Sequence, residues 1–153
     1  MVSERTGDAQ RLWIPGLSRF YDAAVPASYV LMRVCLGLML VPHGADKLFS
    51  DGVLHTAQGL TKLGWPVPLF WAWAACIIEF FGGLMLAVGL LTRIAAAAIA
   101  IEMAVISFAI LWPTWDWAHH GMEYIFVMGV FAFAMALRGG GPYSVDRLLG
   151  TEL

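Results

Sequence analysis

Charged residues are scarce in this chain, since lysine, arginine, aspartate and glutamate together make up 13% of its 153 residues. A soluble globular domain carries about 25% charged residues. The hydrophobic fraction is 60% and the mean hydropathy is +0.75, which excludes that class. There is no basic tail, and the formal net charge of −2 gives no nucleic-acid signal. The composition therefore indicates an integral membrane protein, with room for one domain.

Cysteine is also nearly absent. Cys35 and Cys76 lie in separate apolar runs, without the CxxC spacing of a zinc or thioredoxin-type site. We therefore expect both to be buried as small apolar side chains. The first residues lack a short apolar core followed by a small-residue cleavage site, so a signal peptide is not expected.

Long apolar runs dominate what is present. A helix needs about 20 apolar residues to cross about 30 Å of hydrocarbon, and the runs at 27–49, 67–91 and 94–112 reach that length. A fourth run, 121–137, is shorter. We predict an all-α membrane protein, a four-transmembrane-helix bundle over residues 27–137. A polar loop at 50–66 and a tight turn at Thr92-Arg93 connect its helices, and Trp112-Pro113 ends the third.

The segments that flank the bundle set its orientation. Residues 1–26 hold Trp13, Leu17, Phe20 and Tyr21 at helical spacing, which predicts a short interfacial helix. Residues 138–153 form a C-terminal tail. One side of the membrane receives Arg5, Arg11, Arg19, Arg93, Arg138 and Arg147, whereas the other receives only Lys47 and Lys62. Cytoplasmic segments carry the excess of basic residues, so both termini are predicted to be cytoplasmic.

Four ionisable residues fall in or at the edge of the apolar runs: Arg33, Glu79, Glu102 and Glu123. Charge in hydrocarbon is costly, and such residues usually face a bundle interior and mark a functional site. At a rise of about 1.5 Å per residue, Arg33, Glu79 and Glu102 should meet at similar depth. They form either an ion-pair network that fixes helix register or a proton- or ligand-binding site. The sequence leaves open which glutamate pairs with Arg33.

A second polar group is expected nearer the outer end of the bundle. His43 and Lys47 should face the interior there, and Glu123 follows His119-His120 by a helical turn. They either contact water and headgroups or bind the polar head of a quinone, because histidine titrates near neutral pH and quinone reduction takes up protons. The histidines and Glu123 would also suit a metal, but HHxxE is not a specific spacing, and no metal site is predicted. The expected pocket walls are Phe49, Trp73 and Tyr124.

The order of these motifs resembles a known family. The motifs are Arg33, Pro42-His43-Gly44, Lys47, Glu79-Phe80-Phe81-Gly82-Gly83, Gly89-Leu90-Leu91-Thr92-Arg93, Gly121-Met122-Glu123-Tyr124 and Gly141-Pro142-Tyr143-Ser144-Val145-Asp146-Arg147. As an ordered set over about residues 18–150, they resemble the DoxX family of small bacterial membrane proteins. The chain departs from the family at Gly121-Met122, where two glycines are common.

The resemblance implies a four-helix bundle in the bacterial inner (cytoplasmic) membrane and a link to redox chemistry. The family is named for a subunit of a thiosulfate:quinone oxidoreductase, and other members are associated with membrane complexes that handle thiols and oxidative stress. Family-like positions here are Arg33, His43, Lys47, Glu79, Arg93 and Glu123.

Three functions follow as hypotheses. The first is a membrane subunit of a quinone-linked or thiol- and sulfur-handling oxidoreductase complex, with partner subunits or further copies of itself. Because the chain has no flavin or nucleotide motif, any such enzyme would depend on a partner for its electron carrier. The second is a non-catalytic membrane anchor or assembly protein. The third is a carrier for a small solute or protons, which the lack of an inverted repeat disfavours.

Overall fold

The structure is a computed structural model that describes residues 13–150, and the part of the predicted interfacial segment before Trp13 lies outside the described residues. Its elements are helical throughout these residues, which confirms the all-α prediction. The helices are α1 (Ser18–Phe49), α2 (Gly52–Lys62), α3 (Pro68–Ile77), α4 (Gly83–Val88), α5 (Thr92–Val105), α6 (Glu123–Arg138) and α7 (Val145–Leu149). Two π-helical segments, η2 (Ile78–Gly82) and η3 (Ile106–Leu111), and two short 3-10 turns, η1 (Pro15–Leu17) and η4 (Trp117–His119), complete them.

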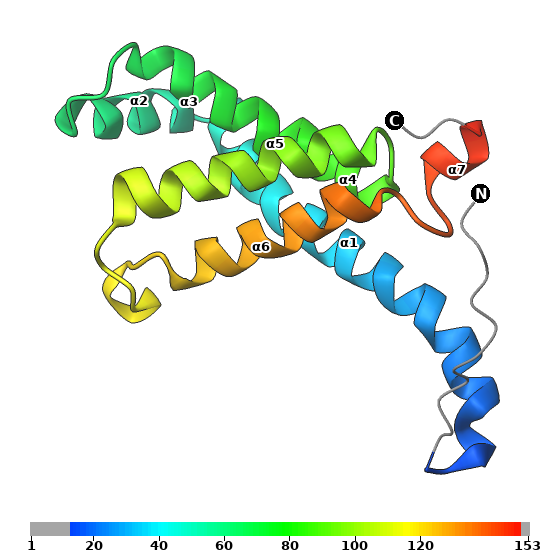
Figure 1. The fold of residues 1–153 in the computed structure, drawn as a ribbon. Coiled ribbons are helices and arrows are strands. Elements are labelled where there is room, and N and C mark those ends of the chain that lie inside the picture. The colour runs from blue at the N-terminus through cyan, green and yellow to red at the C-terminus, as the bar shows by residue number, and fades with distance from the viewer. Residues whose placement is uncertain (1–12, 151–153) are drawn as a thin grey trace.

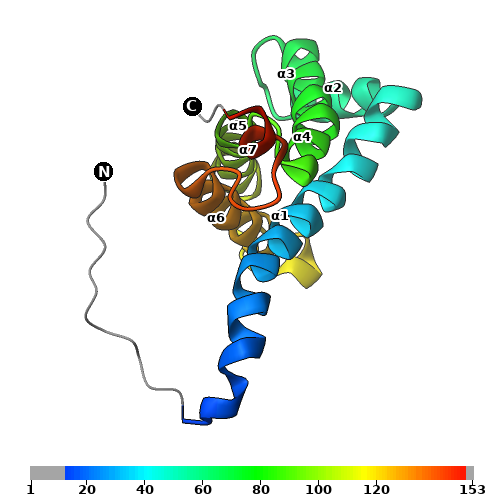
Figure 2. The same ribbon diagram turned by 90° about the vertical axis from the view of Figure 1, so that its right-hand side faces the viewer.

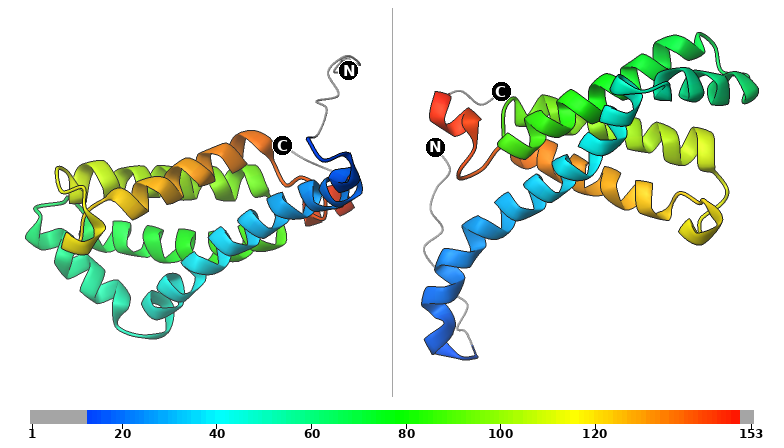
Figure 3. Two further views of the ribbon diagram at one scale, coloured as in Figure 1. Left: turned by 90° about the horizontal axis from the view of Figure 1, so that it is seen from below. Right: turned by 180° about the vertical axis from the view of Figure 1, so that it is seen from behind.

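Long helical rods form the body of the molecule (Figure 1). In chain order, α1 is the first rod, the segments α3, η2 and α4 make the second, α5 and η3 make the third, and α6 is the fourth. The rods α5 and α6 lie antiparallel along each other, whereas α1 crosses the bundle obliquely (Figure 3). Within residues 13–150, three helical stretches are long and apolar enough to span a membrane: Pro15–Phe49, Pro68–Val88 and Thr92–Leu111.

Glycines allow α1 and α4 to touch where they cross. A Cβ atom on Gly37 would collide with the carbonyl oxygen of Gly83 and would lie 2.7 Å from the backbone nitrogen of Ala87. Gly44, two turns further along α1, packs in the same way against the backbone of Phe80. Small residues permit this close approach of backbones in membrane bundles. This close crossing sets the position of α1 against the rod of α3, η2 and α4. It therefore decides which side chains of α1 contact that rod.

The core lies between α1, α4, α5 and α6. Its α5 members, Ala96, Ile99 and Met103, recur at spacings of three and four, which places them on one helical face. The other buried members include Leu36, Leu40, Leu86, Met128, Ala132 and Met135.

The segment at 50–66, predicted as a polar loop, contains α2, so this prediction was wrong. Val53, Ala57 and Leu60 recur at helical spacing and form the apolar face of α2. Val53 and Ala57 pack with Ala72 and Cys76 of α3. The helices α2 and α3 lie side by side (Figures 1 and 2).

The structure also differs from three smaller predictions. The helix α1 starts at Ser18 and runs without a break through Pro26, so the predicted boundary at residue 26 does not separate two helices. Cys76 is buried as expected, but Cys35 is exposed on the surface of the bundle. The hairpin turn lies at 89–91, and α5 starts at Thr92.

Candidate functional site

An ion pair inside the bundle joins α1 to the second rod. The Nζ atom of Lys47 contacts Oε2 of Glu79, and the two side chains are 17% and 8% exposed. Glu79 belongs to the π-helical segment η2. Such segments are rare and frequently occur at functional sites. The pair is therefore a buried charge site placed by an unusual turn of helix.

Glu102 of α5 adds a second carboxylate to this site. Glu79 and Lys47 are the charged groups that act on it. It is 9% exposed, and neither of its carboxylate oxygens has a hydrogen-bond partner among residues 13–150. One lysine thus faces two glutamates. An ionised carboxylate without a partner is very costly in an apolar medium, so this arrangement calls for a proton on one carboxyl or for a ligand that brings a donor or a cation.

A cavity of about 510 Å³ adjoins these three side chains. Its walls come from α2, α3, the connection between them, α5 and η3, and include Thr56, Trp65, Trp71, Ala74, Ala98 and Ile106. Ile101 and Val105, which also line it, are 66% and 37% exposed, so the cavity reaches the outer surface of the bundle. Ligand sites are typically apolar cavities of about 300–1,000 Å³ with a few placed polar groups. This cavity has those properties.

Sequence reasoning missed the walls that α2 and α3 contribute. The rings of Trp65 and Trp71 meet edge to face at a centroid distance of 6.0 Å. The predicted pocket walls, Phe49, Trp73 and Tyr124, did not include these two residues, and residues 50–66 were predicted to be a loop. The spacing of Val53, Ala57 and Leu60 is the signal that would have predicted α2 and, with it, a wall over Glu79.

Arg33 lies away from this cavity, against the C-terminal segment. Its Nη1 donates to the carbonyl oxygen of Gly140, its Nη2 donates to that of Tyr143 at 3.1 Å, and it is 1% exposed. Among residues 13–150, Arg33 forms no ion pair with either Glu79 or Glu102. The predicted pairing of Arg33 with one of these glutamates is therefore not present. Because α1 crosses the bundle obliquely, Lys47 rather than Arg33 reaches the level of the glutamates.

The segment that holds Arg33 is itself fixed by Asp146 of α7. The Asp146 carboxylate accepts hydrogen bonds from the Leu91 nitrogen at 2.6 Å and from the Thr92 nitrogen and hydroxyl at 2.9 and 2.7 Å. Burial raises the pKa of Asp146, but these bonds and the charge of Arg33 outweigh it and hold the pKa below its usual value. Asp146 thus caps the start of α5. Gly89 is required nearby, since a Cβ atom there would lie 2.6 Å from Arg33 Nη1.

The predicted outer group is not assembled in one place. His43 is exposed, and Lys47 turns into the cavity described above. Glu123 lines a separate cavity of about 750 Å³ with Trp117, His120 and Tyr124. Phe49 and Trp73, expected as pocket walls, are 77% and 45% exposed.

His119, in the last connection, has a local partner. His119 Nδ1 contacts Asp116 Oδ2 at 2.7 Å, and both side chains are exposed. In the part of the chain that the structure describes, no group of three or more histidine, cysteine, aspartate or glutamate residues is placed to hold a metal ion.

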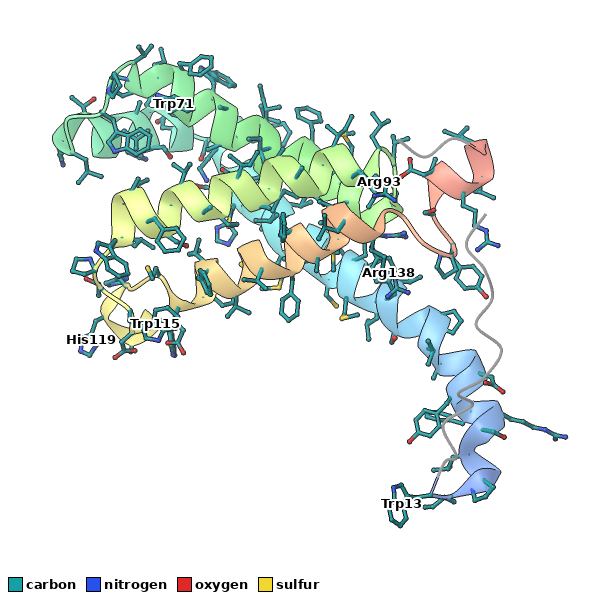
Figure 4. All side chains as sticks on the ribbon, in the orientation of Figure 1. Trp13, Trp71, Arg93, Trp115, His119 and Arg138 are labelled. Atoms are coloured by element: carbon teal, nitrogen blue, oxygen red, sulfur yellow. The ribbon has the colours of Figure 1, made fainter. Side chains whose placement is uncertain are left out.

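The two ends of the bundle differ in side-chain type. Figure 4 shows Trp71, Trp115 and His119 at one end, and Arg93 and Arg138 at the other. Arg93 donates to the carbonyl oxygen of Leu137 at 2.8 Å, and the Arg138 guanidinium lies 4.2 Å from the centre of the Tyr29 ring. An aromatic end and an arginine end are what a membrane-spanning bundle is expected to present at the two interfaces.

Three candidate spans around a buried charge site define a helical membrane protein. The chain belongs to the DoxX family, whose model matches residues 28–112. This range includes Lys47, Glu79 and Glu102, and ends before Glu123 and the C-terminal motif. The chain is also similar to the uncharacterized membrane protein Rv3486 of Mycobacterium tuberculosis, with 30% identity over 98 residues. That match covers 64% of this chain and 57% of the relative's length. No solved structure matches.

Proposed function

We propose that this chain is the membrane subunit of a quinone-linked redox complex, and that the cavity beside Lys47, Glu79 and Glu102 binds the quinone head. The observation that carries this proposal is the unpartnered carboxyl of Glu102 in an otherwise apolar cavity. A ligand with hydrogen-bonding oxygens on an apolar ring would satisfy both properties of the site.

The cavity walls suit a flat ring with an apolar tail. Trp65 and Trp71 offer aromatic faces, and aromatic side chains pair favourably with other rings. The exposed side chains of Ile101 and Val105 mark the opening toward lipid, through which a tail would leave. A lipid-dissolved molecule would thus enter from the membrane and present its ring to the charged residues.

Two groups in the cavity can donate to quinone oxygens. The Lys47 ammonium carries three donors, and one is used by Glu79. A protonated Glu102 carries one donor. A quinone takes up two electrons and two protons to become a quinol, and the electrons would come from a reductant held by a partner subunit. The role of this chain would be to position the ring and to exchange protons with its oxygens.

In the proposed topology, α6 is the fourth span and both termini face the cytoplasm of a bacterial inner membrane. Its 16 residues cover about 24 Å at the helical rise. Support comes from Arg93 and Arg138 at one end of the bundle and from the basic residues of the flanking segments. A cytoplasmic reporter fused after Leu153 should be active. Activity of a periplasmic reporter at that position would reverse the topology.

Binding can be tested by titrating the purified protein with a short-chain benzoquinone and following the quenching of tryptophan fluorescence. A neutral hydrogen bond contributes about 0.5–1.5 kcal/mol, so Glu102→Met should weaken binding by up to about tenfold. Glu102→Gln keeps a donor and should bind like the parent. The matched control is Glu123→Met, in the other cavity, which should also bind like the parent. Absence of saturable binding, or equal affinity in Glu102→Met, would refute quinone binding here.

A second function, assembly of partner proteins, is favoured by a different surface. A groove of about 700 Å³ runs between α5 and α6, and its lining includes Ala97, Ala100, Ala104 and Gly129. Small residues at such spacing admit another transmembrane helix. If no quinone binds, a membrane anchor that docks a partner helix in this groove becomes the better account.

A further inference from the structure

Glu79 and Glu102 line the same cavity, but only Glu79 has a cation to itself. Lys47 contacts Glu79 directly, and both side chains are largely buried. Both oxygens of Glu102 lack hydrogen-bond partners in the part of the chain that the structure describes, although they are buried. The charge of Glu79 is therefore balanced by a lysine, whereas that of an ionised Glu102 would not be, although the two carboxyls are similarly buried.

The charged and polar groups around Glu102 offer no substitute partner. Lys47 of α1 and Glu79 of η2 line the same cavity, and Glu79 carries the same charge as an ionised Glu102. The α2 wall contributes the Thr56 hydroxyl, which donates to the Gly52 carbonyl at 2.8 Å. The remaining walls, from α3 and from α5 itself, are apolar apart from the tryptophan rings. Lys47 contacts Glu79 and makes no hydrogen bond to Glu102, so an ionised Glu102 would be left without a hydrogen-bond partner among the described residues, beside a like charge and apolar walls.

We infer that Glu102 is a protonated carboxyl in a cavity that opens toward lipid, that it is the site of modification by hydrophobic carbodiimides, and that it is the group of this cavity that exchanges a proton with a bound ligand. The ligand part of this inference rests on the proposed function, whereas the modification does not. The opening beside Ile101 and Val105 gives a lipid-dissolved reagent its route to the carboxyl.

The expected modification uses the proton of Glu102. The carboxyl proton moves to one nitrogen of the carbodiimide, and the carboxylate oxygen bonds to the central carbon. The acyl group then shifts to a nitrogen and gives a stable N-acylurea. Nothing leaves, so the mass of the protein rises by that of one whole reagent molecule. An ionised carboxylate lacks the proton for the first step, so labelling must decline as the pH rises.

The test treats the full chain in detergent with dicyclohexylcarbodiimide near neutral pH, followed by intact-mass and peptide mass spectrometry. The parent should carry one adduct, on Glu102, and Glu102→Gln should lose it. Glu123→Gln is the matched control and should label like the parent. Lys47→Met should add a second adduct, on Glu79, because that carboxyl then also lacks a cation. No adduct, or an adduct on Glu79 or Glu123 of the parent in place of Glu102, would overturn the inference.

Addition of a short-chain benzoquinone separates this inference from the proposed function. Protection of Glu102 by the quinone would support both. If added quinone does not lower the amount of adduct on Glu102, the protonated carboxyl is supported and quinone is removed as its ligand. Saturable quinone binding without any labelling of Glu102 would overturn the inference and leave the proposed function standing. Size-exclusion profiles and circular dichroism of each variant check that it is folded.

Discussion

Lys47 is the only cation of the cavity among the described residues, so its removal is the most informative perturbation of the site. Lys47→Met keeps the length of the side chain but leaves Glu79 without its partner and beside Glu102. In soluble proteins, removing one member of a buried ion pair costs about 3–5 kcal/mol, because the other charge stays buried and uncompensated. The two side chains are 17% and 8% exposed, so most of the pair is shielded from the surroundings and its loss should resemble that of a buried pair.

The effect should be visible as a fall in melting temperature in detergent. For a chain of this size, 1 kcal/mol corresponds to about 2–4 °C, so Lys47→Met should melt roughly 6–20 °C below the parent. The double variant Lys47→Met/Glu79→Gln should recover most of the loss, since it removes both charges. Lys62→Met, at an exposed lysine of α2, is the control and should melt with the parent. If Lys47→Met also melts with the parent, the ion pair does not hold α1 to the second rod.

Three further predictions concern the rest of the fold. Arg33→Ala removes two charge-assisted hydrogen bonds to carbonyls of the C-terminal segment and should lower the free energy of unfolding by about 3–6 kcal/mol in detergent unfolding; an unchanged value would show that this segment is not held by Arg33. Gly37→Ala forces a Cβ atom into the backbone of α4 and should cost about 1–3 kcal/mol, whereas Gly59→Ala, which meets nothing within 4 Å, should be neutral or slightly stabilising; equal stability of the two would contradict the close crossing. Because the pKa of Asp146 is lowered in the folded protein, its stabilisation is present above its unfolded pKa of about 4 and is lost as the pH falls through its lower folded pKa. The difference in unfolding free energy between the parent and Asp146→Asn should therefore shrink below about pH 4, and a constant difference would refute this role.

The end of the third apolar run could be predicted because it depends on local sequence. Pro113 stops this run, and the helical segment ends at Leu111, as the structure confirms. Burial of Glu79 and Glu102 could also be predicted, since an ionisable residue within an apolar run usually faces the interior of the bundle.

The partners of the charged residues could not be predicted in the same way. A membrane depth counted along straight helices, from the start of each apolar run, places Arg33 level with the glutamates. The close contact of Gly37 with Gly83 sets α1 at an oblique crossing instead, and this brings Lys47 to Glu79. A crossing angle depends on side-chain packing between segments far apart in the sequence, so counting residues along one helix does not provide it.

The most direct test of the central claim is to map where a quinone binds. A photoreactive azidoquinone should be cross-linked to the full chain in liposomes by light, and the labelled peptides identified by mass spectrometry. Quinone binding in the cavity beside Lys47, Glu79 and Glu102 predicts label on the lining segments at 56–79 and 98–110, with competition by unlabelled quinone and loss of label in Glu102→Met. Label confined to residues 117–127, or label that unlabelled quinone does not displace, would contradict it.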